Sequence, residues 1–181
     1  MPLGQEPAEL IRQKLFYAAR KFDFDVSELR LPNGSVGDWA CIVHPGGAMA
    51  VPVTDDGLFV LVRQYRFAMK GRLLEFPAGT VEAHERPLST IQREIQEETG
   101  YKASTWKVLG EFPNAPGYSD EIIYAYLATG LAKLTEAPER DEDEDIEVVL
   151  MSADELEQAI LSGEPVDAKT IAAFYMAKAS L

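Results

Sequence analysis

Residues 87–99 constrain the fold of this chain most, because they join helical periodicity to a strict order of acidic residues. Three aliphatic residues recur at helical spacing and form one stripe: Leu88, Ile91 and Ile95. Pro87 suits the first helical position, and Gly100 suits the residue after the last. Three glutamates share the adjacent side of the helix: Glu94, Glu97 and Glu98. The pattern predicts a helix that packs on a sheet and presents a row of carboxylates beside that contact.

The crowded carboxylates predict a metal site. Like charges held together repel, and they tend to take up protons unless a cation sits among them. Hard oxygen ligands suit Mg²⁺ or Mn²⁺. Arg93 precedes Glu97 by one helical turn and can hold it in place, while Gly79 leads into the helix and lets a backbone oxygen approach a metal. The alternative for an isolated glutamate-rich helix is a solvated acidic face.

The segment Gly79–Tyr101, GTVEAHERPLSTIQREIQEETGY, carries further residues at fixed spacing. Glu85 follows Gly79 by six residues, and Arg93 follows Glu85 by eight. The segment resembles the Nudix box, with all seven fixed residue types in place and Tyr101 where the family has an aliphatic residue. The resemblance implies the α+β Nudix fold, an α/β/α layered domain with a mixed central sheet, flanking helices and an N-terminal antiparallel sheet.

The hydrophobic pattern of the other segments agrees with mixed strands and few helices. Residues 48–54 and 58–66 predict a hairpin across Asp55-Asp56-Gly57, whereas residues 7–20 fit either a short helix or a strand. Further strands are expected at 22–26, 39–43, 73–76, 106–112, 121–128 and 145–151. Helices are expected at 152–162, where Ser152 and Glu155 form a capping box, and at 167–179.

Four segments outside the box, taken together and in order, resemble the ADP-ribose pyrophosphatase branch of the Nudix family. They are Gln64-Tyr65-Arg66, Leu74–Gly79, Pro116–Glu121 and the acidic run 141–147. The resemblance implies metal ligation by four residues: Glu94, Glu98, Glu144 and the backbone carbonyl of Ala78. It implies catalytic roles for Glu142, Glu97 and Arg93, with Glu142 orienting or deprotonating water. Asp141 and Asp143 are neighbours that fit the role of Glu142 almost as well.

The resemblance also implies a substrate site. Arg66 would meet the diphosphate, and the loop with Gly117 and Glu121 would border the terminal ribose. Trp39 is a candidate contact for the substrate base, although a large aromatic residue more often lies in a core or a dimer interface. Each segment also has a structural alternative, because acidic runs are usually solvated, a strand-end arginine is usually a surface charge and Pro-Gly is first of all a turn.

The implied reaction is metal-dependent hydrolysis of a nucleoside diphosphate sugar, namely ADP-ribose to AMP and ribose 5-phosphate. Alternatives are another sugar nucleotide or dinucleotide, such as GDP-mannose or NADH, or an ADP-ribose sensor that does not cleave. A net charge of −13 argues against nucleic-acid binding and would repel a diphosphate unless a divalent cation, Mg²⁺ or Mn²⁺, stood between them.

The organisation expected from sequence is one domain with an N-terminal extension. Residues 1–47 would form strands that contact a second subunit, and residues 48–181 would form the Nudix hydrolase domain. No apolar stretch is long enough to span a bilayer and the first residues do not resemble a secretion signal, so no membrane contact is expected. The single cysteine, Cys41, excludes an internal disulfide and agrees with a cytoplasmic location.

Overall fold

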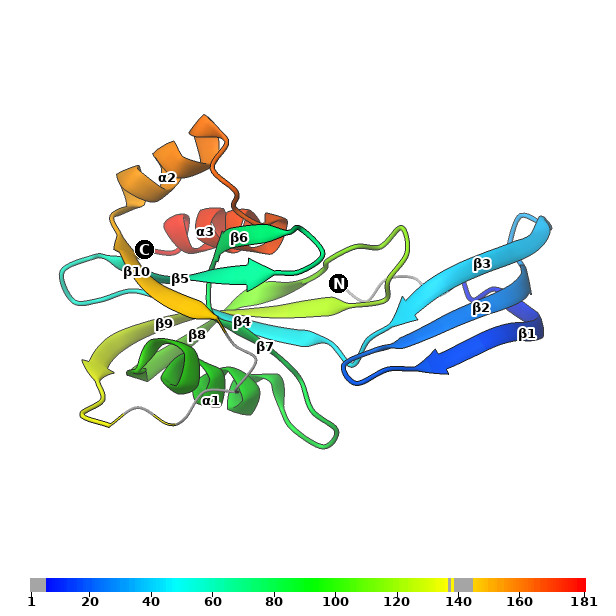
Figure 1. Cartoon of the computed structure of the whole chain (residues 1–181), viewed down its shortest axis with the longest axis horizontal. Helices are drawn as coiled ribbons and strands as arrows, with labels where there is room; N and C mark the ends of the chain where they lie inside the picture. The colour runs from blue at the N-terminus through cyan, green and yellow to red at the C-terminus, as the bar shows by residue number, and fades with distance from the viewer. Residues whose placement is uncertain (1–5, 137, 139–144) are drawn as a thin grey trace. The chain divides into compact units, whose positions relative to one another are not determined.

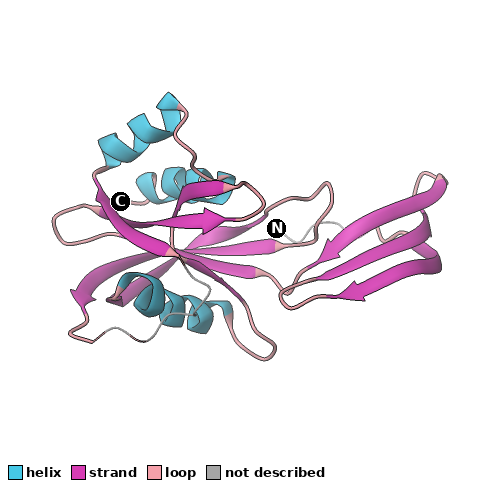
Figure 2. Cartoon of the chain, viewed as in Figure 1, coloured by secondary structure: helices cyan, strands magenta, loops and turns pink. Residues whose placement is uncertain are grey.

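The computed structural model describes residues 6–136, 138 and 145–181, so Glu142 and Glu144 lie outside the described residues. Figure 1 labels the strands and helices, and Figure 2 separates them by colour. The first strands are β1 (Glu9–Ala18), β2 (Asp23–Arg30), β3 (Val36–Val43), β4 (Gly47–Pro52), β5 (Phe59–Arg66), β6 (Gly71–Glu75) and β7 (Ala78–Thr80). Then follow α1 (Pro87–Thr99), β8 (Tyr101–Pro113), β9 (Ile122–Lys133), β10 (Ile146–Met151), α2 (Ala153–Ser162) and α3 (Ala168–Lys178).

The chain divides into two compact units. Residues 1–45 and 113–121 form the first unit, and residues 46–112 and 122–181 form the second. The first unit contains the antiparallel sheet β1-β2-β3, in which the ambiguous residues around 9–18 form a strand. The loop before β9 belongs to this unit because Ile42 N donates to the carbonyl of Tyr118 at 2.8 Å, and His44 N donates to Asp120 Oδ1 at 2.8 Å.

The central sheet of the second unit has the strand order β7-β4-β9-β8. Strand β4 runs parallel to β9 and antiparallel to β7, so the sheet is mixed, as the sequence predicted. Side chains of β4 alternate between two cores. Ala48 and Ala50 join the core under α1, whereas Met49 and Val51 join the core that includes α3. Helices therefore cover both faces of this sheet, which confirms the α/β/α layering (Figure 1).

The hairpin predicted across Asp55-Asp56-Gly57 is wrong, although the turn itself is present. Thr54 N donates to the carbonyl of Leu58 at 2.9 Å, and Val53 makes one bridge to Phe59. Beyond that bridge the two strands separate into different sheets, since β4 pairs with β7 and β9, and β5 pairs with β6 and β10. Each strand already has a partner on both edges, so no edge is left for the hairpin pairing.

The helix boundaries agree closely with their sequence signals. Helix α1 begins at Pro87 and ends before Gly100, whose φ of 72° is the left-handed conformation that glycine adopts readily. Ser152 and Glu155 form the reciprocal capping box of α2, and the side chain of Asp167 caps α3. Among the described residues, none of the helices has both the length and the apolar character needed to cross a membrane.

Candidate active site

Packing of α1 fixes the direction in which its acidic residues point. Ile91 and Ile95 are fully buried in the core that also contains Ala48 and Ala50 of β4, and Leu88 packs against the same core. The helix therefore cannot rotate about its axis without exposing these side chains. As a consequence, the positions of the three box glutamates are set by the hydrophobic contact on the neighbouring side of the helix.

Arg93 lies among the glutamates of the Nudix box. Its Nη1 is 2.9 Å from Glu94 Oε1 and 2.9 Å from Glu97 Oε2, and its Nη2 is 3.5 Å from Glu85 Oε2. Burial would lower the pKa of Arg93, but the charges of the three glutamates raise it above its ordinary value. The contact with Glu97 is the one that their spacing in the sequence predicts. Arg93 thus holds the carboxylates of the loop and the helix together.

Strand β7 lies directly against the acidic side of α1. The buried carboxylate of Glu98, in a residue only 2% exposed, accepts the backbone N–H of Ala78 at 3.2 Å. A Cβ added at Gly79 would overlap the side chain of Glu94, so any larger residue there would push the Glu94 carboxylate away from the strand. The strand and the helix therefore place the backbone of residues 78–79 next to two of the expected metal ligands.

The oxygen donors of this region fit a hard divalent cation. Among the described residues, Glu85 Oε2 is buried and accepts no hydrogen bond, although Arg93 Nη2 lies 3.5 Å away. Within residues 6–136, 138 and 145–181, no three acidic, histidine or cysteine side chains are already grouped so that they could hold a metal ion. Glu142 and Glu144, the other acidic residues expected at the site, lie outside this part of the chain.

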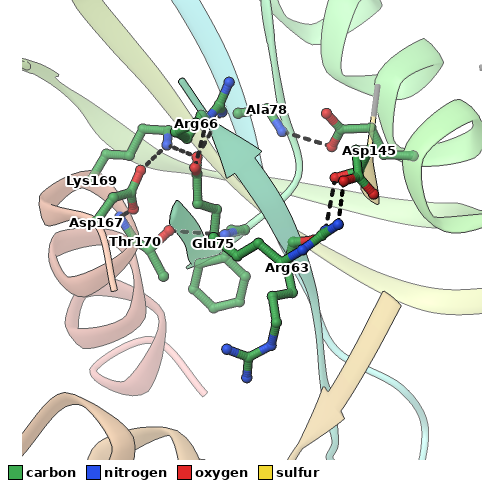
Figure 3. A network of polar contacts seen from close by, with 11 residues as sticks. Arg63, Arg66, Glu75, Ala78, Asp145, Asp167, Lys169 and Thr170 are labelled. Carbon is green, nitrogen blue, oxygen red and sulfur yellow. Dashed lines mark hydrogen bonds and ion pairs between the residues drawn. The ribbon is translucent and has the colours of Figure 1, made fainter. Parts of the chain in front are cut away.

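Arg66, at the end of β5, is bound to a carboxylate that the sequence analysis did not single out. Its Nε and Nη2 donate to the two oxygens of Glu75 at 2.7 and 2.8 Å, and Lys169 Nζ lies 2.5 Å from Glu75 Oε2 (Figure 3). Burial would raise the pKa of Glu75, but the bond from Arg66 and the charge of Lys169 lower it to about 2. The sequence did contain a signal for this ion-pair site. Glu75 is the only charged residue in the apolar run Leu73–Pro77, and a charge buried with such a run needs charged or hydrogen-bonding partners.

The remaining candidates for substrate contact lie in the first compact unit. Trp39 is half-buried on β3, opposite Ser27 of β2, and Gly117 is exposed in the loop before β9. Glu121 accepts a hydrogen bond from Asn114 Nδ2 at 2.7 Å, and His44 Nδ1 lies 3.6 Å from its other carboxylate oxygen. The structure thus brings Ala78, Arg93 and the three box glutamates together in the second unit, and it places this second group in the unit with the N-terminal sheet.

The fold and the box define the class of protein. A sequence profile of the NUDIX domain matches residues 43–174, which is most of the chain. The chain therefore belongs to the Nudix family, and it is a Nudix pyrophosphohydrolase, as the box predicted.

Relatives with assigned activities cover nearly the whole chain. The ADP-ribose pyrophosphatase of Bacillus subtilis is 36% identical over 160 residues, which are 88% of this chain and 86% of the relative. The methanol dehydrogenase activator of Bacillus methanolicus is 35% identical over 163 residues, 90% of this chain and 88% of that protein. The ADP-ribose pyrophosphatase of Mycobacterium tuberculosis is 33% identical over 171 residues, 94% and 83% of the two chains.

A solved structure supports the fold along the full length. The crystal structure of an ADP compounds hydrolase superposes with a TM-score of 0.82 and covers 99% of this chain and 96% of its own. The two sequences are only 21% identical, so this similarity bears on the fold alone. It confirms the predicted α+β architecture, including the N-terminal strands.

Proposed function

We propose that this protein hydrolyses ADP-ribose to AMP and ribose 5-phosphate with the help of Mg²⁺, with Mn²⁺ as a substitute. The observation that carries the proposal is the joint placement of Glu85, Glu94 and Glu97 around Arg93, with Glu98 bonded to Ala78. The two relatives named ADP-ribose pyrophosphatase, at 36% and 33% identity, support this choice of substrate.

The residues proposed to hold the cation are Glu94, Glu98, Glu144 and the backbone carbonyl of Ala78. When bound, the cation would neutralise the diphosphate and ease the ionisation of the attacking water. Buried Glu98 has its orientation set by the Ala78 N–H before any ligand arrives, and Arg93 restrains Glu94 and Glu97. Such preorganisation lowers the cost of assembling the site when the substrate binds.

The roles proposed for the other residues follow the charge of the substrate. Arg66 would donate to oxygens of the diphosphate, for which a guanidinium is well suited. Glu142 would take the proton from the water that attacks phosphorus, as the phosphorus–oxygen bond to the leaving phosphate breaks. Trp39 would contact the adenine base, and Gly117 and Glu121 would border the terminal ribose.

We further propose that the protein is a cytoplasmic homodimer that uses its N-terminal sheet as an interface. Every residue of β1 is exposed, including several large apolar ones: Leu10, Ile11, Leu15, Phe16 and Tyr17. Large apolar side chains on a strand that is exposed along its length favour burial against another chain, and two-fold symmetry is the usual arrangement. The acidic net charge of −13 supports the expectation that nucleic acid is no partner.

A substrate panel tests the proposed activity. Purified protein with Mg²⁺ is incubated with ADP-ribose, GDP-mannose, NADH and other sugar nucleotides, and the products are separated by chromatography. We expect AMP and ribose 5-phosphate from ADP-ribose at the highest kcat/KM of the panel. A higher value for another sugar nucleotide would replace the substrate, and binding of ADP-ribose without cleavage would identify a sensor instead of an enzyme.

A further inference from the structure

We propose that Glu75 and Lys169 are positioning residues that fix the guanidinium of Arg66 for its contact with the diphosphate. The inference rests on the proposed function, because it assigns a task to residues around the proposed phosphate-binding arginine. Neither residue belongs to the Nudix box, and Lys169 follows Arg66 by more than a hundred residues. Figure 3 shows the three side chains meeting where β5, β6 and α3 come together.

The contact between Arg66 and Glu75 sets the direction of the guanidinium. Two of its nitrogens donate to the two oxygens of one carboxylate, at 2.7 and 2.8 Å. A paired contact of this kind fixes the plane of the guanidinium, which a single bond would leave free to rotate. The side chain of Arg66 is still 40% exposed, whereas that of Glu75 is only 3% exposed, so the buried partner orients the accessible one.

Lys169, on α3, is the second cation that contacts the carboxylate of Glu75. Its ammonium lies 2.5 Å from Glu75 Oε2 and also contacts Asp167, and its side chain is 12% exposed. Asp167 caps α3 by accepting the N–H of Thr170 at 2.8 Å, and the hydroxyl of Thr170 accepts the N–H of Phe76 at 2.9 Å. The first turn of α3 is thus bonded to the residue that follows Glu75. This gives Lys169 a fixed place beside the carboxylate.

Charge balance explains why two cations surround Glu75. The four side chains Arg66, Glu75, Asp167 and Lys169 carry two positive and two negative charges. Compared with apolar residues of similar size, a buried ion pair adds little stability, because the loss of hydration offsets most of the attraction. A carboxylate placed at a nearly inaccessible position therefore points to a task other than stability. We infer that this task is to fix the orientation of the half-exposed guanidinium of Arg66.

Steady-state kinetics on four variants test the proposal. We expect Glu75→Gln to raise KM for ADP-ribose by about tenfold to a hundredfold while kcat changes by less than about threefold, because an arginine that loses its orientation binds phosphate less well. Lys169→Met should act in the same direction, and Lys169→Arg should restore most of the loss. Glu164→Gln breaks a comparable ion pair on β5, with Arg63 Nη2 at 2.7 Å from Glu164 Oε1, and should leave KM unchanged.

A double-mutant comparison separates positioning from a general effect on the fold. In the Arg66→Met background, Glu75→Gln should add little to KM, because the group that it positions is gone. A full additional increase in that background would overturn the proposal, as would an unchanged KM in a folded Glu75→Gln protein. If Glu75→Gln does not fold, the comparison of Lys169→Met with Lys169→Arg decides, and equal KM values for wild type and both variants would refute it.

Direct binding distinguishes a failure of this inference from a failure of the proposed function. Calorimetry with ADP-ribose and Ca²⁺ in place of Mg²⁺ reports affinity without turnover. If the wild type binds but does not cleave, the proposed reaction fails, and a rise of at least about tenfold in the Kd of Glu75→Gln still supports the positioning role. If Glu75→Gln binds ADP-ribose as tightly as the wild type, the positioning role is refuted even where hydrolysis is confirmed. If the wild type neither binds nor cleaves ADP-ribose, both proposals fall.

Discussion

The backbone N–H of Ala78 donates to the buried carboxylate of Glu98 at 3.2 Å, across twenty residues of chain. This bond joins strand β7, at the start of the Nudix box, to the last turn of helix α1. Because Glu98 is only 2% exposed, its carboxylate has little water to compensate its charge and depends on partners that the fold supplies. The pair therefore links the architecture of the sheet to the electrostatics of the candidate metal site.

Removal of divalent cations should abolish hydrolysis. The glutamates of α1 and Glu85 place several negative charges beside the proposed diphosphate site, so we expect a cation to be needed to offset the repulsion. Product formation is measured with excess chelator and again after addition of Mg²⁺ or Mn²⁺, which should restore it. Undiminished turnover in excess chelator would rule out the proposed mechanism.

Replacement of Glu98 by glutamine should leave the fold intact and reduce kcat by at least about two orders of magnitude. The amide oxygen can still accept the N–H of Ala78, but the charge that would bind the cation is lost. Circular dichroism checks the fold and steady-state kinetics at saturating Mg²⁺ check the rate. Glu111→Gln, at an exposed position of β8, is the matched control and should behave as wild type. Near wild-type turnover of Glu98→Gln would contradict its assignment as a metal ligand.

Substitutions in the acidic run 141–147 test whether this segment is catalytic or only a solvated loop. If Glu142 positions the attacking water, Glu142→Gln should lower kcat by roughly 10² to 10⁴ with little change in KM. Glu144→Gln should weaken metal affinity, so part of its defect should recover at high Mg²⁺. Because Asp141 or Asp143 can compensate for one change, the decisive variant replaces both glutamates.

The control for this double variant is Asp55→Asn with Asp56→Asn, which removes two exposed charges from the turn before β5. It should hydrolyse ADP-ribose at the wild-type rate. A wild-type rate for the Glu142 and Glu144 double variant as well would show that the loop takes no part in the reaction.

The N-terminal sheet should mediate dimerisation. Phe16 on β1 is 51% exposed, and an acidic residue there should disfavour an apolar interface. We expect a dimeric mass for the wild type by light scattering at micromolar concentration, and a monomeric or dissociating species for Phe16→Asp. Val108→Asp changes a residue that is 68% exposed on β8 and should stay dimeric. A monomeric wild type would exclude the interface.

The ion pairs of Glu75 should make stability depend on acid pH. The pKa of Glu75 is lowered to about 2 in the folded protein, whereas an unfolded glutamate titrates near about 4.3. Its contribution is therefore complete above the unfolded pKa and is lost as the pH falls towards 2. Urea unfolding should show that the stability difference between wild type and Glu75→Gln shrinks by about 2 kcal/mol from pH 7 to pH 3. A difference that does not change with pH would contradict this assignment.

The local elements and the box chemistry were accessible from sequence because they depend on neighbours in the chain. Helix α1 is delimited by Pro87 and Gly100, and its apolar stripe and its contact between Arg93 and Glu97 follow from spacings of three and four residues. The capping box of Ser152 and Glu155 is local in the same way. Such features keep their geometry wherever the helix lies in the fold.

Tertiary structure decided which strands pair and which charges meet. The turn after β4 was visible in the sequence, yet its two strands join different sheets, because partners distant in the chain occupy their edges. Residues 113–121 group with the N-terminal strands for the same reason: the partners lie far apart in the chain. Likewise, Glu75 meets Lys169 only because α3 packs beside the end of β6. Contacts between residues far apart in the chain depend on how whole elements pack, and local periodicity in the sequence does not predict that packing.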